Sequence, residues 1–358
     1  MNDEWRNFAF LGANTADGFY SLYDNLASLD NGDFLWIIKG GAGCGKSSFM
    51  RLIAAAAEKK QLSVNYYACS GDPDSLDAIY IPALKTAYMD GTSPHVADAS
   101  LTAVNSSYLD LGRFYDIEAI APHKEELSAC SAEISSHYKK AYGLLHAAGA
   151  LRRGWLPTLV GEDELVAAKK RVTGIIRREL GTRRRSGGEI DRRFFSVLSC
   201  RGLFALPESL KAFYTRSYTL ESRLGLSALM LDLVAKSAEQ SGYRILLAPD
   251  PLTPEVPEAV VIPALSLAFF SSASTLKKQA AARGIHLDTR LDGEARRERK
   301  SEIQRYERTI TSLKNEAELS LSQAKCAHDK LEQIYNPYVD FDGVQAQAEE
   351  HIKRLGLA

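Results

Sequence analysis

The stretch FLWIIKGGAGCGKSSFMRLIAAAAE, residues 34 to 58, decides how the first part of this chain folds. It begins with a mostly apolar run, passes through four glycines in six positions, and ends in a run rich in alanine. The apolar run predicts a strand over residues 34–39, and the alanine-rich run predicts a helix from Ser47 to about Glu58. Glycines between a strand and a helix permit backbone conformations that other residues avoid. The sequence therefore predicts a tight turn from the end of a strand into the N-terminus of a helix.

This turn matches the P-loop pattern GxxxxGK[ST], in which backbone N–H groups surround phosphate groups at a helix N-terminus. Lys46 would reach the β- and γ-phosphates, and the Ser47 hydroxyl would be a ligand of Mg²⁺. The alternative is an ordinary glycine-rich turn, which the flanking strand and helix disfavour. The residues expected to contact a nucleotide are Gly40, Gly41, Ala42, Gly43, Cys44, Gly45, Lys46, Ser47 and Ser48.

A carboxylate on a second predicted strand would complete the metal site. Residues 85–90, KTAYMD, predict a strand that ends in Asp90. In P-loop proteins, an acid at the end of a neighbouring strand holds the Mg²⁺, so Asp90 is the expected metal-side acid. Asp72 and Asp74 compete for that role, or would act as a base on water or on an acceptor hydroxyl. His95 would sense a γ-phosphate, or is an ordinary loop histidine.

The chain repeats part of its sequence after about 180 residues. Residues 220–233, LESRLGLSALMLDL, align with residues 40–53 at an offset of 180. The tetrapeptide IPAL at 81–84 recurs at 262–265, an offset of 181. A near-constant offset across separate segments indicates a tandem duplication.

The second copy has lost the residues that would bind phosphate. At the offset of 180 or 181, Gly40, Gly41, Gly43, Lys46 and Asp90 become Leu220, Glu221, Arg223, Leu226 and Ser271. Side chains would fill the anion-binding loop, and no cation or metal-side acid would remain to offset phosphate charge. We therefore expect one nucleotide site, in the first half.

Two long segments, residues 127–151 and 303–334, carry apolar or small residues at alternating spacings of three and four. This spacing predicts two long helices, which we call the helical arms. Shorter helices at about 162–180 and 343–355 are expected to fold back on the arms as antiparallel hairpins. The arms would pack on each other, or would project and bind a protein partner.

The expected fold class is α/β, with two tandem P-loop NTPase-like cores that have parallel sheets and are each followed by an antiparallel helical hairpin. The first half is residues 1–185 with its arm at about 123–180, and the second is residues 193–358 with its arm at about 292–356. Residues 181–192 form an Arg/Gly linker. The arginines of 177–193 would be a solvated loop, a finger on a γ-phosphate or a patch for nucleic acid.

Composition narrows the class of protein. Of 358 residues, 45% are hydrophobic, which is enough to build a substantial core. The 44 Lys and Arg residues nearly balance the 45 Asp and Glu residues, which disfavours a dedicated nucleic-acid binder. The five scattered cysteines argue against a disulfide framework and favour the cytoplasm, and no export signal or membrane span is expected. Within the loop, Cys44 would have a lowered thiol pKa, or is simply a small residue tolerated there.

Several segments, the loop among them, are together more specific than the loop pattern alone. They are residues 12–24, 39–48, 69–77, 81–82, 90–95 and 338–341. In these segments the chain resembles a bacterial family of tandem P-loop ATPases found largely in Firmicutes, and the resemblance covers essentially the whole chain. It implies nucleotide binding in both halves, whereas the second loop of this chain departs from the pattern.

The leading hypothesis is a Mg²⁺-dependent ATP hydrolase that acts as a slow conformational switch, with ATP moving the helical arms. Gly91 follows Asp90 where many fast ATPases carry Glu, and no guanine-reading NKxD motif follows the loop. The expected cofactors are therefore ATP and Mg²⁺. One alternative is a small-molecule or nucleotide kinase, in which Asp72 or Asp74 activates an acceptor hydroxyl. The other is a binding module that senses nucleotide without hydrolysing it.

Overall fold

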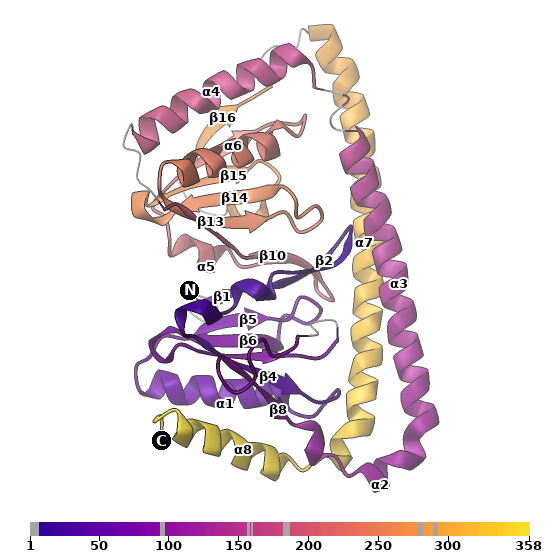
Figure 1. The fold of residues 1–358 in the computed structure, drawn as a ribbon. Coiled ribbons are helices and arrows are strands. Elements are labelled where there is room, and N and C mark those ends of the chain that lie inside the picture. The colour runs from indigo at the N-terminus through magenta and orange to yellow at the C-terminus, as the bar shows by residue number, and fades with distance from the viewer. Residues whose placement is uncertain are drawn as a thin grey trace.

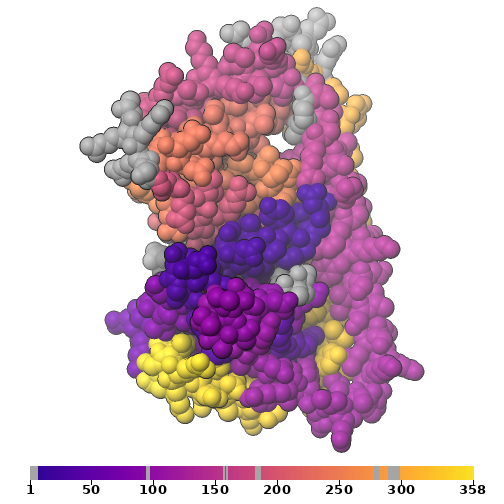
Figure 2. All heavy atoms as spheres, viewed as in Figure 1, coloured from indigo at the N-terminus to yellow at the C-terminus, as the bar shows by residue number. Residues whose placement is uncertain are grey.

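The structure, a computed structural model, contains two α/β cores joined along one side by a pair of long helices (Figure 1). It describes residues 7–93, 97–155, 158, 160–181, 187–277, 282–288 and 293–358, and only the backbone of residues 293–298. The space-filling view shows the two cores stacked, with helix α3 along the side of the stack (Figure 2). This arrangement confirms the α/β class.

The first core is built on a six-stranded sheet. Its strands, in spatial order, are β1 (Phe8–Ala9), β5 (Asn65–Ala68), β6 (Leu76–Ile81), β7 (Thr86–Asp90), β4 (Phe34–Lys39) and β8 (Ser106–Asp110). The sheet is mixed, because β6 runs antiparallel to both β5 and β7. The expectation of a parallel sheet was therefore wrong for β6. Short turns join β6 to its neighbours, whereas parallel neighbours require a longer crossover.

The second core has a six-stranded sheet of the same order. Its strands are β9 (Glu189–Arg192), β13 (Arg244–Pro249), β14 (Pro257–Ile262), β15 (Leu267–Ser271), β12 (Arg216–Glu221) and β16 (Arg283–His286). The strand β14 is the antiparallel member, as β6 is in the first sheet. Lys85 and Ser266, which follow the two IPAL segments, even share a left-handed backbone conformation, with φ of 48° and 47°. This match is what an internal duplication would produce.

Helices cover the outer face of each sheet. The helices of the first half are α1 (Lys46–Lys59), α2 (Ile117–Ile120), α3 (Lys124–Trp155) and α4 (Glu162–Leu180), and those of the second half are α5 (Pro207–Lys211), α6 (Leu226–Gln240), α7 (Gly293–Tyr335) and α8 (Phe341–Arg354). The arms are α3 and α7, and they lie side by side. Packing of the arms on each other, rather than their projection from the cores, is thus the observed arrangement.

Within the described residues, neither of the shorter helices packs mainly on its adjacent arm, as the expected hairpins require. Instead, α4 packs on α6 of the second core, and α8 returns to pack on α1 of the first core. Each arm thus carries the chain from one core to the other, so the halves 1–185 and 193–358 exchange their terminal helices. The exchange buries the apolar face of α4 against α6, and the apolar face of α8, including Val344 and Ala348, against α1.

The inner faces of the two sheets share one hydrophobic cluster. At its centre Phe10 and Phe194, both fully buried, exchange backbone hydrogen bonds of 2.9 Å in each direction. Two hairpins, β2–β3 (Gly12–Thr15, Gly18–Ser21) and β10–β11 (Ser196–Ser199, Gly202–Ala205), cross between the cores. Each large apolar side chain buried here contributes about 1.5–3 kcal/mol, so the shared cluster stabilises the contact between the cores.

The expected linker is partly structured. Residues 189–192 form the edge strand β9, and Arg183, Arg184 and Arg185 lie outside the described residues. Arg178 donates to the Tyr218 hydroxyl at 3.0 Å, so it serves the second core. Within the described residues, none of the helices combines the length and the apolar character that crossing a membrane requires.

Candidate functional site

The glycine-rich loop, residues 40–45, connects β4 to α1 as the sequence predicts. Gly43 and Gly45 have φ of 74° and 85°, values in the left-handed region that side chains disfavour. Gly45 is the N-cap of α1, so the loop ends where the positive end of the helix dipole lies. These features form a backbone cradle suited to an anion.

Lys46 is the first residue of α1, and its side chain folds back over the loop. Its Nζ donates to the carbonyl oxygens of Gly40 at 2.9 Å and Gly41 at 2.7 Å. It also lies 3.6 Å from Oδ2 of Asp90, with only 13% and 15% of the two side chains exposed. Because water largely cannot reach this pair, solvent screens it less than a surface pair.

Asp90 reaches Lys46 because β7 lies beside β4, with Asp90 paired with Ile38 in the register. Its Oδ1 accepts hydrogen bonds from the backbone N–H of Thr92 at 2.9 Å and from the Thr92 hydroxyl at 2.6 Å. These bonds leave Oδ2 directed toward Lys46. The Ser47 hydroxyl oxygen accepts from the backbone N–H of Leu76 at 3.0 Å. A hydroxyl and a carboxylate are suitable Mg²⁺ ligands, so these residues fit the expected metal.

The two other candidate acids are held elsewhere. Asp72 lies 3.3 Å from Lys325 of α7, and Asp74 lies 2.8 Å from Arg201 of the β10–β11 hairpin. The structure therefore brings Asp90 to Lys46 and gives Asp72 and Asp74 partners on the second half. His95 lies outside the described residues.

Cys44 does not have the lowered thiol pKa that its position in the loop suggested. The side chain is 1% exposed, and burial raises the pKa of the thiol above its ordinary value. The nearby Lys46 lowers that pKa, but its effect is smaller than that of burial. The thiol therefore stays protonated at neutral pH, and the lowered pKa is wrong.

Residues far along the chain pack closely around the loop. A Cβ added at Gly41 would lie 2.9 Å from the Tyr115 hydroxyl, and one added at Gly43 would lie 2.6 Å from the Asn336 amide. The backbone of Glu332 lies 3.5 Å from the same Gly43 position. Sequence analysis missed these three neighbours of the loop.

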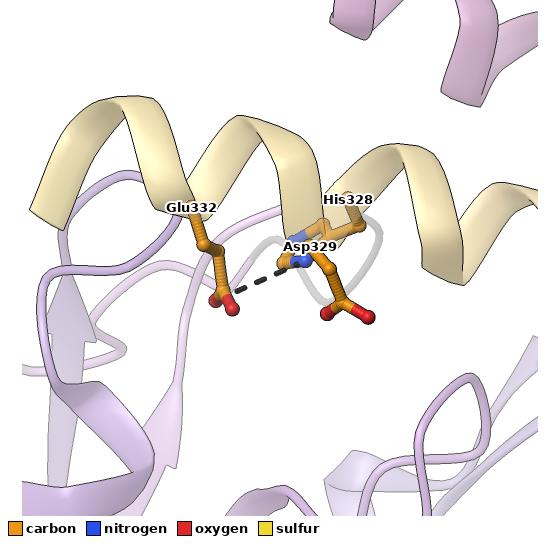
Figure 3. A group of neighbouring side chains, drawn as sticks. All are labelled: His328, Asp329 and Glu332. Carbon is orange, nitrogen blue, oxygen red and sulfur yellow. Dashed lines mark ion pairs between the residues drawn. The ribbon is translucent and has the colours of Figure 1, made fainter.

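One further cluster on α7 has side chains suited to a cation. His328, Asp329 and Glu332 place one ligand atom each within 4.8 Å of one another, and their side chains extend from α7 (Figure 3). Each already has a partner on the same helix, since His328 lies 3.8 Å from Glu332 and Asp329 pairs with Lys325. The cluster is therefore explained by pairs within the helix.

The corresponding loop of the second core is closed. Four residues, 222–225, separate β12 from α6, whereas six residues, 40–45, separate β4 from α1. Asp288 fills this shortened loop by accepting from the Ser222 hydroxyl and from the Arg223 backbone N–H, both at 2.7 Å. A carboxylate of the chain itself thus occupies the Arg223 N–H, and the Ser222 hydroxyl accepts from the N–H groups of Leu224 and Leu226, so these donors are not free for an anion.

The shortened loop also corrects the alignment of the two copies. In the sheet register Leu220 pairs with Ser271 as Ile38 pairs with Asp90, so Leu220 corresponds to Ile38 rather than to Gly40. The equivalences of Glu221 with Gly41 and of Arg223 with Gly43 shift with it. Leu226 still takes the place of Lys46, because each is the first residue of its helix, and Ser271 still takes the place of Asp90. The loop of the second core is two residues shorter, and this difference explains why the strand before the loop and the helix after it align at different offsets.

Comparison with known proteins leaves the site to be interpreted from its geometry. No protein-family model, curated protein or solved structure matches this chain.

Proposed function

We propose that this protein binds a nucleoside triphosphate with Mg²⁺ at the glycine-rich loop of its first half, and hydrolyses it slowly. The observation that carries the proposal is the pairing of this loop with a lysine and a carboxylate. Glycines with positive φ precede a helix N-terminus, and the lysine that follows them lies 3.6 Å from Asp90 on the neighbouring strand. Backbone N–H groups, a lysine and a metal-side acid are the parts that phosphoryl transfer uses in P-loop proteins.

Each residue has a distinct part in this proposal. The loop N–H groups would bind phosphate oxygens, and Lys46 would leave the carbonyls of Gly40 and Gly41 to neutralise charge on the β- and γ-phosphates. Ser47 and Asp90 would hold the Mg²⁺, which stabilises developing charge when bound. ATP is the preferred nucleotide because the chain has no guanine-reading NKxD motif after the loop.

A nucleotide sensor that does not hydrolyse is the second candidate. The observation in its favour is that Asp72 and Asp74 pair with Lys325 and Arg201 rather than with Lys46. Each of these acids would have to leave its partner before it could orient a water molecule. A sensor would bind Mg·ATP with little turnover.

The test is to measure phosphate release and equilibrium binding of Mg·ATP with the full chain. Lys46→Ala is expected to abolish release and to weaken binding by at least tenfold. Lys59→Ala, at the exposed end of the same helix, is the matched control and is expected to behave as the wild type. Binding without release would support the sensor, and binding unaffected by Lys46→Ala would refute the site.

A further inference from the structure

Two carbonyl groups of the glycine-rich loop accept hydrogen bonds from side chains outside the loop. The Tyr115 hydroxyl donates to the carbonyl of Ala42 at 2.6 Å. With its amide nitrogen toward the loop, Asn336 donates to the carbonyl of Gly43 at 3.2 Å and to that of Glu332 at 3.1 Å. The amide is assigned this way because the opposite orientation would place its oxygen against these two carbonyl oxygens. Burial raises the pKa of the Tyr115 hydroxyl, so it stays protonated and remains a donor.

These two bonds decide where the next two N–H groups point. A peptide unit is planar and trans, so its C=O and N–H point in opposite directions. When Tyr115 holds the Ala42 carbonyl, the N–H of Gly43 points to the opposite side of the peptide, away from Tyr115. In the same way, the hydrogen bond from Asn336 to the Gly43 carbonyl fixes the direction in which the N–H of Cys44 points. Without the donors, the backbone at glycine could rotate and lose the arrangement that binds an anion.

The two donors come from different halves of the chain, and the residue that precedes Asn336 contacts Tyr115. Tyr115 follows β8 of the first core, whereas Asn336 directly follows α7, the arm of the second half. The ring of Tyr335, the last residue of α7, packs on the ring of Tyr115 with centroids 5.3 Å apart. The contact between Lys325 and Asp72 fixes the same arm to the first core three turns earlier. The end of α7 is therefore held against the loop at several points.

We propose that Tyr115 and Asn336 are positioning residues of the anion-binding loop, and that the second half regulates nucleotide affinity through the placement of α7. This inference rests on the proposed function, because it names the regulation of the same site. A displacement of the arm removes the Asn336 donor and weakens binding. Binding effects are reciprocal, so nucleotide bound at the loop in turn stabilises the docked end of α7.

The first experiment measures the affinity of Mg·ATP by titration calorimetry for the full chain and its variants. Tyr115→Phe and Asn336→Ala are each expected to weaken binding about tenfold, the effect of one hydrogen bond in a shielded site. Tyr108→Phe, whose hydroxyl bonds Asp98, and Asn315→Ala, exposed on α7, are the matched controls and are expected to retain wild-type affinity. Unchanged melting temperatures confirm that the variants fold.

The second measurement is amide hydrogen exchange, which a merely structural role of the two residues would not affect in this way. In the free protein, Tyr115→Phe and Asn336→Ala are each expected to speed amide exchange at residues 40–46. Mg·ATP is expected to slow exchange at 40–46 and also at 330–339 in the wild type, but not in Lys46→Ala. Wild-type affinity in both variants, or protection confined to 40–46, would overturn this inference alone. Absence of Lys46-dependent binding would refute the proposed function and this inference with it.

Discussion

Replacing Glu258 by Gln is expected to make the protein more stable relative to the wild type as the pH rises from 5 to 7. Glu258 lies in β14, is 3% exposed, and accepts hydrogen bonds from the hydroxyls of Ser196 and Ser274. Burial first, and then the charge of the neighbouring Asp250, raise the pKa of its carboxyl group to about 8. Arg152 pairs with Asp250 at 2.8 Å and opposes the shift of Glu258 only weakly.

The sign of the effect follows from the order of the two pKa values. In the unfolded chain a Glu has a pKa near 4.3, so between about pH 4.3 and 8 the unfolded chain releases a proton that the folded protein keeps. The stabilising contribution of the neutral Glu258 is complete below this window and falls as the pH rises through it. Between pH 5 and pH 7 the free energy of unfolding falls by about 2–3 kcal/mol. For a chain of this length, that corresponds to about 4 °C in melting temperature.

The assay is thermal unfolding followed by circular dichroism at both pH values. The melting temperature of Glu258→Gln relative to the wild type is expected to rise by about 4 °C from pH 5 to pH 7. Glu255→Gln is the matched control, because Glu255 is 47% exposed and pairs with Arg153 at the surface. A difference between Glu258→Gln and the wild type that stays the same at both pH values would refute a neutral Glu258.

Two further predictions concern packing and the closed loop. Leu145 lies in the buried seam between α3 and α7, and Leu145→Ala is expected to lower the free energy of unfolding by about 2–5 kcal/mol. The side chain of Leu319 is 51% exposed, so Leu319→Ala is expected to change that free energy by less than about 0.5 kcal/mol. Urea unfolding measures both, and equal effects would contradict the packing of the arms. Asp288→Ala is expected to cost about 1–3 kcal/mol, because it leaves donors of the shortened loop unpaired, and to leave Mg·ATP affinity unchanged. Weaker binding in calorimetry would contradict a single site in the first half.

The local part of the site could be predicted because its signal is local. Glycines between an apolar run and an alanine-rich run define the turn within a few residues, and helix α1 begins at Lys46, one residue from the expected start. The proximity of Asp90 to Lys46 required only that two strands end at one edge of one sheet, and β4 and β7 are neighbours. The fold class followed from the same alternation of strands and helices.

The long-range part could not be predicted, because an apolar helix face shows that a helix packs but not on what. The apolar faces of α4 and α8 could be buried equally well against the adjacent arm or against the opposite core. In the structure each of them packs on the opposite core. The donors of the loop are hidden for a related reason. Tyr115 lies 73 residues from Ala42, and a tyrosine in a loop carries no signal of the carbonyl that it will meet.

The exchange of terminal helices gives the second half a structural part in the first core. The second core packs Phe194 against Phe10 of the first, and α8, which follows the arm of the second half, packs on α1 of the first core. The arm is one continuous helix of 43 residues, about 65 Å long, that begins beside the second core and ends at the loop. The second half therefore contributes to the proposed site through the position of Asn336 rather than through chemistry of its own.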